Sequence, residues 1–279
     1  MQPFNTSRER AALRTVRSSS DADDTTSVWL FFALACVITW LCDVPLVLAR
    51  IQGVAPPSYA VPLAVVGAFG PTLAALIMTG LRPSALRDVF ARWRTAPQWI
   101  LIGLFTPLAL HLLATALDVA LGGSPAGWFY FPSTSGQVVG MLVFSIGGEF
   151  GWRGYAQPRM TGIYGPIGGA LLLGVVWTGW HSLLTFSPGS QLWLLSMGAM
   201  LIELSLYAVL FVWFLARCNG SILVAIALRA GAHLDDVSHA PVTELRLRAL
   251  RLAVLAVAAL FAGRSLLRTP APLRDPAGS

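Results

Sequence analysis

Charged residues are scarce in this chain. Only 11% of its 279 residues are Asp, Glu, Lys or Arg, whereas a soluble domain averages about 25%. Hydrophobic residues make up 56% of the sequence, and they form several apolar runs of about 20 residues, long enough for a helix to cross a bilayer. The alternating strands of an outer-membrane barrel are also missing. These features exclude an ordinary soluble domain and predict a multi-pass α-helical membrane protein.

Lysine is absent, and all 19 basic residues are arginine. This composition is typical of a GC-rich genome and favours a bacterial source. The net charge is +6, but the arginines lie at the ends of apolar runs and form no single basic stripe. We therefore interpret the charge as a topology signal and expect no nucleic-acid partner. The few cysteines form neither a CxxC pair nor a zinc-ligand spacing, so we expect small buried side chains at Cys36, Cys42 and Cys218.

The apolar runs predict an all-α polytopic bundle of about eight transmembrane helices. The predicted helices are 28–48, 60–81, 99–121, 136–151, 166–184, 192–215, 221–237 and 249–263. Residues 1–27 are polar and lack a signal-peptide core, so they predict a disordered cytoplasmic tail. Residues 28–263 then form the transmembrane domain, and residues 264–279 form a second cytoplasmic tail.

Arginine positions predict the orientation of these helices. Most arginines fall in the first tail, in the connection 82–98 and after the sixth and last helices, whereas 122–135 and 185–190 carry no charge. The positive-inside rule then places both termini in the cytoplasm of a cell-membrane protein. Arg50 and the connection 235–248 are the exceptions to this asymmetry.

A short set of ionisable residues lies inside the predicted spans. Each one costs about 2.5–3.5 kcal/mol at the bilayer centre, so each should face a partner or a wet cavity. No HExxH, GxSxG or GxxxxGK motif accompanies them. The set is Asp43, His111, Asp118, Glu149, Arg153, His181, Glu203, Arg229 and His233.

Three segments bring most of these residues into motifs. GGEFGWRGYAQPRM places Glu149 and Arg153 four residues apart on one helix face, either as part of a site or as an ion pair that holds helices together. WTGWH ends in His181, which is either a buried core residue or a general base or metal ligand. NGSILVAIALRAGAH contains Arg229 and His233 at the same spacing, and Arg229 should meet an acid such as Glu149.

These three segments resemble the ordered motifs of the CAAX-protease and bacteriocin-processing family of intramembrane proteases (CPBP, Abi-type). ITW at 38–40 and GAFGPTLAAL at 67–76 resemble the first two helices of that family, so the resemblance covers about 28–234. It implies a helical bundle around a polar cavity that opens to one side. It also implies an endopeptidase that acts near the membrane face on membrane-associated peptides or proteins.

The chain departs from the family pattern at three positions. The family has two adjacent glutamates, and here the first is Gly148 and the second is Glu149. Arg153 and His181 match the family, whereas Arg229 and His233 stand where it has histidine and asparagine. In the family the first glutamate and the histidine of WTGWH activate water, with a metal in some proposals, and the second glutamate pairs with the arginine. The loss of a positioned general base typically costs about 10²–10⁴ in rate, so we expect impaired activity.

The resemblance leaves the catalytic assignment open. Glu149 and His181 are the remaining catalytic candidates, with Arg153 and Arg229 as ion-pair residues. A zinc site formed by His181, His233 and Glu203 is an alternative, since two histidines and one carboxylate suit zinc. The positive charge of Arg229 would repel such a cation, although it suits an oxyanion donor. The other intramembrane polar residues are interpreted as structural: Asp43, His111 and Asp118.

Two functions from different classes follow. The first is an intramembrane endopeptidase, metal-dependent or glutamate-dependent, with activity impaired by Gly148 and Arg229. The second is a pseudoprotease that binds a membrane peptide or partner without cutting it, as in bacteriocin immunity. A transporter is disfavoured because the chain lacks two similar halves with matched broken helices. Whether the chain is an enzyme stays open, and its expected partners are the lipid bilayer and a membrane-associated peptide or protein.

Overall fold

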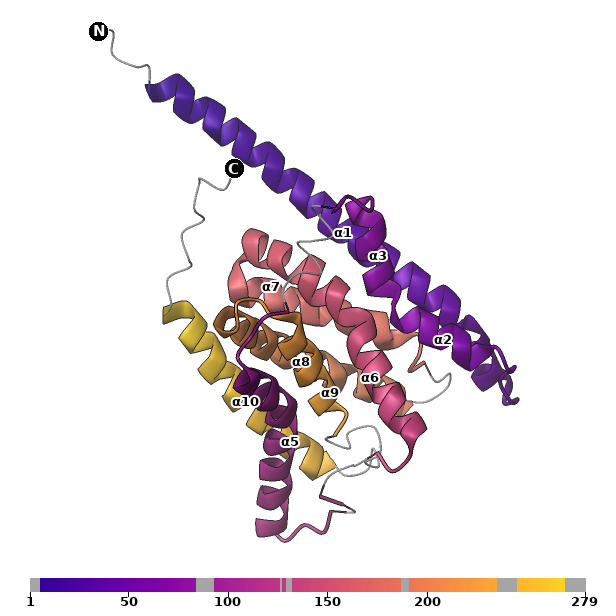
Figure 1. Ribbon diagram of the computed structural model, residues 1–279. Helices are drawn as coiled ribbons and strands as arrows, with labels where there is room; N and C mark the ends of the chain where they lie inside the picture. The colour runs from indigo at the N-terminus through magenta and orange to yellow at the C-terminus, as the bar shows by residue number, and fades with distance from the viewer. Residues whose placement is uncertain are drawn as a thin grey trace.

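A computed structural model describes residues 6–83, 93–125, 127–128, 132–186, 191–234 and 245–268, with side chains described except at 6–24 and 191–192. Over these residues the regular structure is helical and contains no strand, which confirms the predicted all-α membrane bundle (Figure 1). The elements are α1 Thr6–Gln52, α2 Ala60–Ala68, α3 Gly70–Thr79, α5 Pro97–Ala120, α6 Ser135–Glu149, a π-helix Phe150–Ala156, α7 Gln157–Ser182, α8 Gln191–Arg217, α9 Ile222–Ala232 and α10 Leu245–Arg268.

Five helical stretches in the described chain are long and apolar enough to cross a membrane, and the bent pair α2 and α3 makes a sixth. The pair bends by 50° at Phe69, where one straight helix over 60–81 was predicted. Pro71 lies in the first turn of α3, where a missing N–H costs nothing, so a new helix starts there. The chain is thus a multi-pass membrane protein.

The predicted helices 136–151 and 166–184 are joined by helical structure instead of a loop. The π-helix continues α6 directly into α7. Within α7 the helix is interrupted at Gly165, which has φ 73° and ψ 171°. Such a positive φ is easily adopted only by glycine. The break at Gly165 therefore corresponds to the predicted start at Pro166. The middle of the first motif forms the buried π-helix, between the end of α6 and the start of α7.

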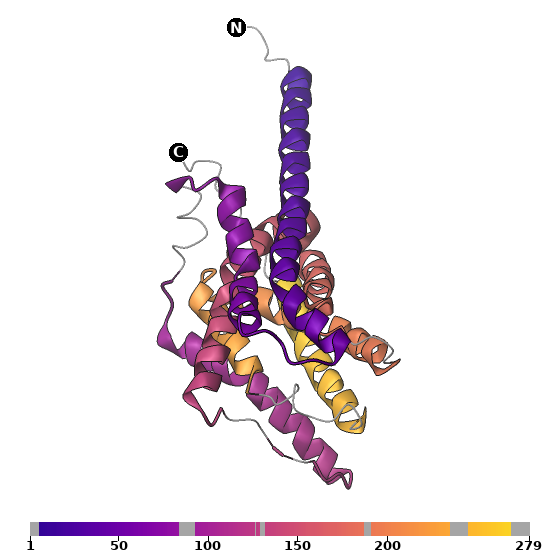
Figure 2. The same ribbon diagram turned by 90° about the vertical axis from the view of Figure 1, so that its right-hand side faces the viewer.

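The first helix differs from the prediction because it begins at Thr6. It includes most of residues 1–27, which were expected to form a disordered tail. The segment RERAALR contains residues with high helix propensity, which explains why the helix extends beyond the apolar span. Its N-terminal half projects beyond the other helices (Figure 2).

Small residues set the helix contacts that position the site. A Cβ atom on Gly174 of α7 would lie 2.4 Å from Cα of Ser205 in α8. A Cβ atom on Gly231 of α9 would lie 2.0 Å from the carbonyl oxygen of Leu104 in α5. Such close approach of backbones is typical of helix pairs in membranes. It fixes α9, which carries the third motif, inside the bundle.

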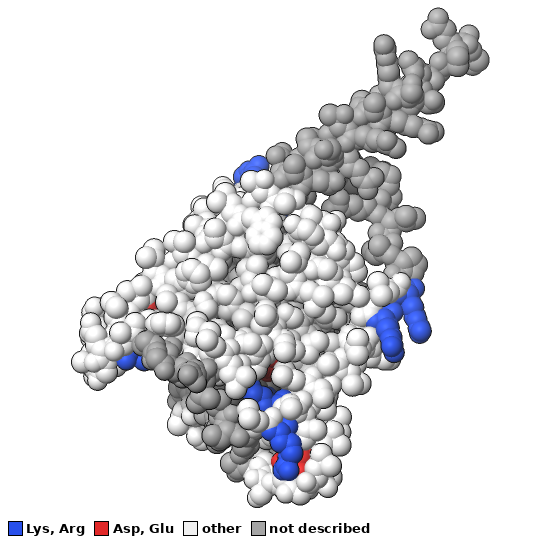
Figure 3. All heavy atoms as spheres, turned by 180° about the vertical axis from the view of Figure 1, so that it is seen from behind, with Lys and Arg blue, Asp and Glu red and all other residues white. Residues whose placement is uncertain are grey.

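Arginines that break the positive-inside pattern have partners in the structure. Arg246 of α10 donates to the buried Asp118 of α5 at 2.6 Å. Arg50 donates to the carbonyl oxygens of Leu184 and Phe186 at the end of α7. Seen from behind, the middle of the bundle surface is almost free of charged side chains (Figure 3). These contacts account for two exceptions, while the orientation of the termini stays a prediction.

Candidate functional site

The predicted pair of Glu149 and Arg153 is formed at the junction of α6 and the π-helix. Glu149 Oε2 lies 3.2 Å from Arg153 Nε, and each residue is only 1% exposed. Arg153 also donates from Nη1 to Gln157 Oε1 at 3.2 Å, and its guanidinium lies 3.8 Å from the ring centroid of Phe211. The pair is therefore enclosed by protein and held from several sides.

Gly148 lies beside the indole of Trp152. A Cβ atom at Gly148 would be 3.0 Å from both Cδ1 and Nε1 of that indole, which is tighter than normal packing. Trp152 is 1% exposed and makes edge contacts with Phe31 and Trp180, with ring centroids 5.8 and 5.9 Å apart. The indole thus takes much of the space that a larger side chain at position 148 would enter.

His181, near the end of α7, has partners at both ring nitrogens. Its Nδ1 lies 2.9 Å from the carbonyl oxygen of Trp177, and a carbonyl only accepts, so Nδ1 is the donor. Nε2 is then the acceptor, and Nη2 of Arg229 lies 3.4 Å from it. The guanidinium of Arg229 also lies 4.5 Å from the ring centroid of Trp177. The nitrogen that would take a proton or bind a metal therefore faces a cation.

A cavity of about 330 Å³ adjoins His181. Val61 of α2 and Phe144 of α6 line it and are themselves 58% and 41% exposed. Both residues belong to candidate membrane spans, so the cavity lies in the membrane-spanning part of the bundle. The polar residues of its lining are Thr39, Asp43, His181, Arg229 and His233, and the apolar ones include Leu46, Val61, Ala64, Phe144 and Leu184.

Residues of the ITW segment form hydrogen bonds between the helices that line this cavity. Thr39 accepts from Trp180 Nε1 at 2.8 Å and donates to the carbonyl oxygen of Gly67 at 2.7 Å. Trp40 donates to the carbonyl oxygen of Trp180 at 3.1 Å. These bonds join α1 to α2 and α7, so the segment positions the site, a role that the sequence did not indicate.

Asp43 lines the cavity as well. The sequence interpretation treated it as a structural polar group, and the structure places it in the cavity lining, 3% exposed. Its position four residues after Thr39 places both on one face of α1, and this spacing was the available signal. His233 also lines the cavity, and its Nε2 is buried with no hydrogen-bond partner among the described residues.

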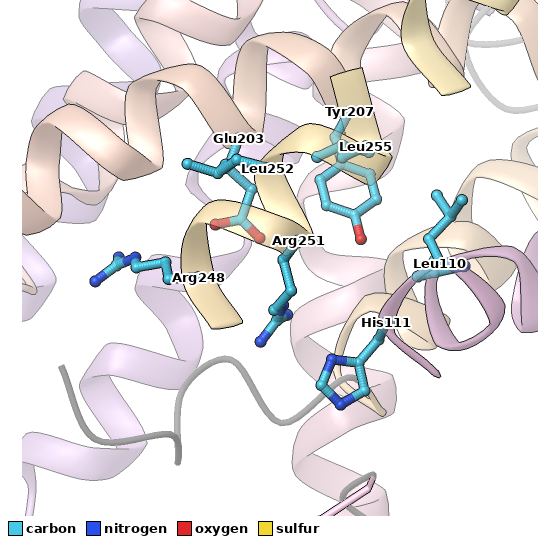
Figure 4. A pocket seen from close by; sticks show the side chains of 9 residues that line it. Leu110, His111, Glu203, Tyr207, Arg248, Arg251, Leu252 and Leu255 are labelled. Atoms are coloured by element: carbon cyan, nitrogen blue, oxygen red, sulfur yellow. The ribbon is translucent and has the colours of Figure 1, made fainter. Parts of the chain in front are cut away.

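Glu203 lies elsewhere. It lines a separate pocket between α8 and α10, with Arg248, Arg251 and His111 (Figure 4). The structure therefore does not bring it to His181 and His233. Among the described residues no three His, Cys, Asp or Glu side chains are grouped so as to hold a metal ion. With Arg229 against His181 as well, the donors of this site do not fit a zinc ion.

Residues 132–234 match the family model described as Rce1-like, type II CAAX prenyl endopeptidase. This segment contains all three motifs, from the stretch around Glu149 to His233, and the match confirms the resemblance inferred from them. No curated protein matches the chain.

Proposed function

We propose that this chain, a CAAX-protease-like member of a membrane endopeptidase family, binds a membrane-associated peptide or protein segment without cutting it by the family's water-activating reaction. The cavity beside His181 is the proposed binding site. The observation that carries the proposal is the contact of Arg229 Nη2 with His181 Nε2 at 3.4 Å. It engages the one ring nitrogen that hydrolysis would need.

The carboxylates support the same conclusion. A general base must come within hydrogen-bond reach of the water that it activates. Gly148 offers no side chain, and Trp152 stands in its place. Glu149 is paired with Arg153 and is not among the residues that line the cavity. Neither motif position therefore presents a carboxylate to a bound peptide.

The electrostatics at His181 oppose a hydrolytic role for the imidazole. A guanidinium is always charged and donates only, so Arg229 holds Nε2 as an acceptor and disfavours a second positive charge there. The same fixed charge opposes a divalent cation. No step of the proposed function involves a metal.

The cavity itself supports binding. Its volume of about 330 Å³ lies in the usual range for ligand sites. A lining that is mostly apolar and includes a few polar groups suits a membrane segment that has both apolar and polar side chains. A role such as protection against a membrane-active peptide, as in bacteriocin immunity, belongs to this class.

Retained proteolysis is the second candidate, and Asp43 is the observation that favours it. This carboxylate lines the same cavity as Arg229 and His233. A base at Asp43 with Arg229 as an oxyanion donor would form a metal-free peptidase, a different reaction from that of the family.

Cleavage and capture can be measured in one experiment. The purified protein in nanodiscs receives quenched fluorescent peptides with an N-terminal acyl chain, and a photo-crosslinking residue at position 144 reports occupancy of the cavity. We expect crosslinking without a rise in fluorescence. Fluorescence that rises in wild type and in His111→Ala, but not in His181→Ala, would refute the proposal. His111 is the matched control because it lies in the other pocket.

A gain-of-function variant completes the test. Gly148→Glu with Arg229→His returns two of the three family side chains, and Trp152→Leu makes room for the glutamate. We expect this triple variant to cleave a peptide that wild type only binds. Equal cleavage by wild type and the variant would show that the present residues already suffice for hydrolysis.

A further inference from the structure

We infer that Asp43 selects the ligand of this cavity by pairing with a basic side chain of a bound membrane peptide. The inference rests on the proposed binding function and specifies its ligand class. Asp43 would then be a specificity residue, with no part in bond cleavage.

Asp43 is a buried acid without a partner. It lies within the long apolar span of α1, is 3% exposed and lines the cavity. Among the described residues it makes no hydrogen bond and no ion pair, whereas Glu149 and Asp118 each have an arginine. An unpaired carboxylate at such depth is costly. Its partner is therefore expected to come from a ligand.

Arg229, the cationic residue that lines the cavity, contacts residues other than Asp43. Arg229 contacts His181 at 3.4 Å and lies over the ring of Trp177 at 4.5 Å. No ion pair within 4.0 Å joins it to Asp43 in the described chain. Gly67 lets α2 pack closely against α1 at this point, since a Cβ atom there would lie 2.9 Å from Cys42 Cβ and 3.5 Å from Asp43 Oδ1.

The remaining lining favours a lysine or arginine side chain. These side chains bury an apolar stem and place their charge at the tip. Leu46, Val61 and Ala64 supply an apolar lining for the stem, and Asp43 supplies the acid for the tip. The unpartnered Nε2 of His233 remains for a second polar group of the peptide, such as a backbone carbonyl.

The test uses two synthetic membrane-spanning peptides of leucine and alanine that differ at one central residue, lysine or norleucine. Their affinities for the full chain are measured by fluorescence anisotropy in phosphatidylcholine nanodiscs. We expect wild type to bind the lysine peptide at least about tenfold more tightly. Asp43→Asn should abolish this preference and leave the affinity for the norleucine peptide unchanged. The control Glu203→Gln, a carboxylate in the other pocket, should keep the preference.

A charge reversal guards against a folding defect in Asp43→Asn. Asp43→Lys should prefer a peptide with central glutamate over the lysine peptide. The inference is overturned if Asp43→Asn keeps the lysine preference, if Glu203→Gln loses it too, or if wild type shows none. It is also overturned if phosphatidylethanolamine in the nanodiscs displaces both peptides, since the cation would then come from a lipid amine.

The two proposals fail in distinguishable ways. If both peptides bind with equal affinity, the specificity role of Asp43 is refuted, whereas the proposed peptide binding is not. If the lysine peptide is cleaved and the cleavage depends on His181, the proposed binding without hydrolysis is refuted. In that case the lysine preference of wild type over Asp43→Asn still supports the inference.

Discussion

Glu149→Gln should act on stability and leave peptide binding intact. In the structure Glu149 is 1% exposed, its Oε2 lies 3.2 Å from Arg153 Nε, and it does not line the cavity. If it were a catalytic base, the neutral variant would lose turnover and keep its fold. The structure predicts the reverse, because the substitution leaves the buried cation of Arg153 without its counter-ion.

The size of the effect follows from the surroundings of Arg153. Removing one partner of a buried ion pair typically costs about 3–5 kcal/mol. Arg153 keeps Gln157 at 3.2 Å and the ring of Phe211 at 3.8 Å, so we expect the lower half of this range. At about 2–4 °C per kcal/mol for a chain near this size, the melting temperature should fall by roughly 6–16 °C.

A double-mutant cycle checks this reasoning. Replacing both members of a buried pair by apolar residues is often neutral or stabilising. Glu149→Leu/Arg153→Met should therefore melt near wild type, although each single variant melts well below it. Melting is followed in detergent by intrinsic tryptophan fluorescence, with Glu203→Gln as the control, a half-buried acid outside this pair.

Two results would refute the structural role of Glu149. One is additivity, in which the double variant loses the sum of the two single losses. The other is a Glu149→Gln protein that melts like wild type but loses a cleavage activity that wild type has. The second result would place Glu149 back in a reacting site.

Two further substitutions test the packing. Gly174→Ala should lower the melting temperature in detergent by an amount equivalent to about 1–3 kcal/mol, because its Cβ atom would meet the backbone of Ser205 at 2.4 Å. Gly179→Ala on the same helix should not, since nothing lies within 4 Å of that position; equal losses would contradict the close α7 and α8 contact. Gly148→Glu alone should also destabilise by about 1–3 kcal/mol, and Trp152→Leu should recover part of the loss, as judged by the same melts. An undisturbed Gly148→Glu variant would show that the indole does not occupy this space.

The helices could be predicted from the sequence because apolar runs and their lengths are local properties. Every predicted helix overlaps a described helix. As spans, however, five or six described stretches are long and apolar enough where about eight were predicted, because α6 and α7 form one continuous stretch and α9 is shorter. The π-helix after Glu149 could not be predicted, since a change of hydrogen-bond spacing leaves the side-chain pattern almost unchanged. The start of the first helix at Thr6 could not be predicted from the apolar run, which begins only at about 28, although residues before it have high helix propensity.

In the candidate site, too, contacts within one helix could be predicted from the sequence, whereas contacts between helices could not. Glu149 and Arg153 could be paired from the sequence because they are one helical turn apart. The contact of Arg229 with His181 joins residues 48 positions apart, and it depends on how α7 and α9 pack. The expected partner of Arg229 was Glu149, and the two do attract each other electrostatically. The carboxylate accepts its side-chain hydrogen bond from Arg153 instead. Glu203 was offered as a ligand since periodicity cannot tell which helices its face meets.

The substitutions at the motif positions form a connected set in the structure. An arginine in place of a histidine adds a charge that must be accommodated inside a membrane, and here the acceptor nitrogen of His181 and the ring of Trp177 accommodate it. A glycine in place of a glutamate removes a charge and leaves room, and Trp152 takes that room. At both positions the structure thus has contacts that stabilise the bundle, while the neighbouring cavity stays open. Two polar groups that line this cavity have no hydrogen-bond partner among the described residues, namely the carboxylate of Asp43 and Nε2 of His233. Under the proposed function these two groups hold the ligand.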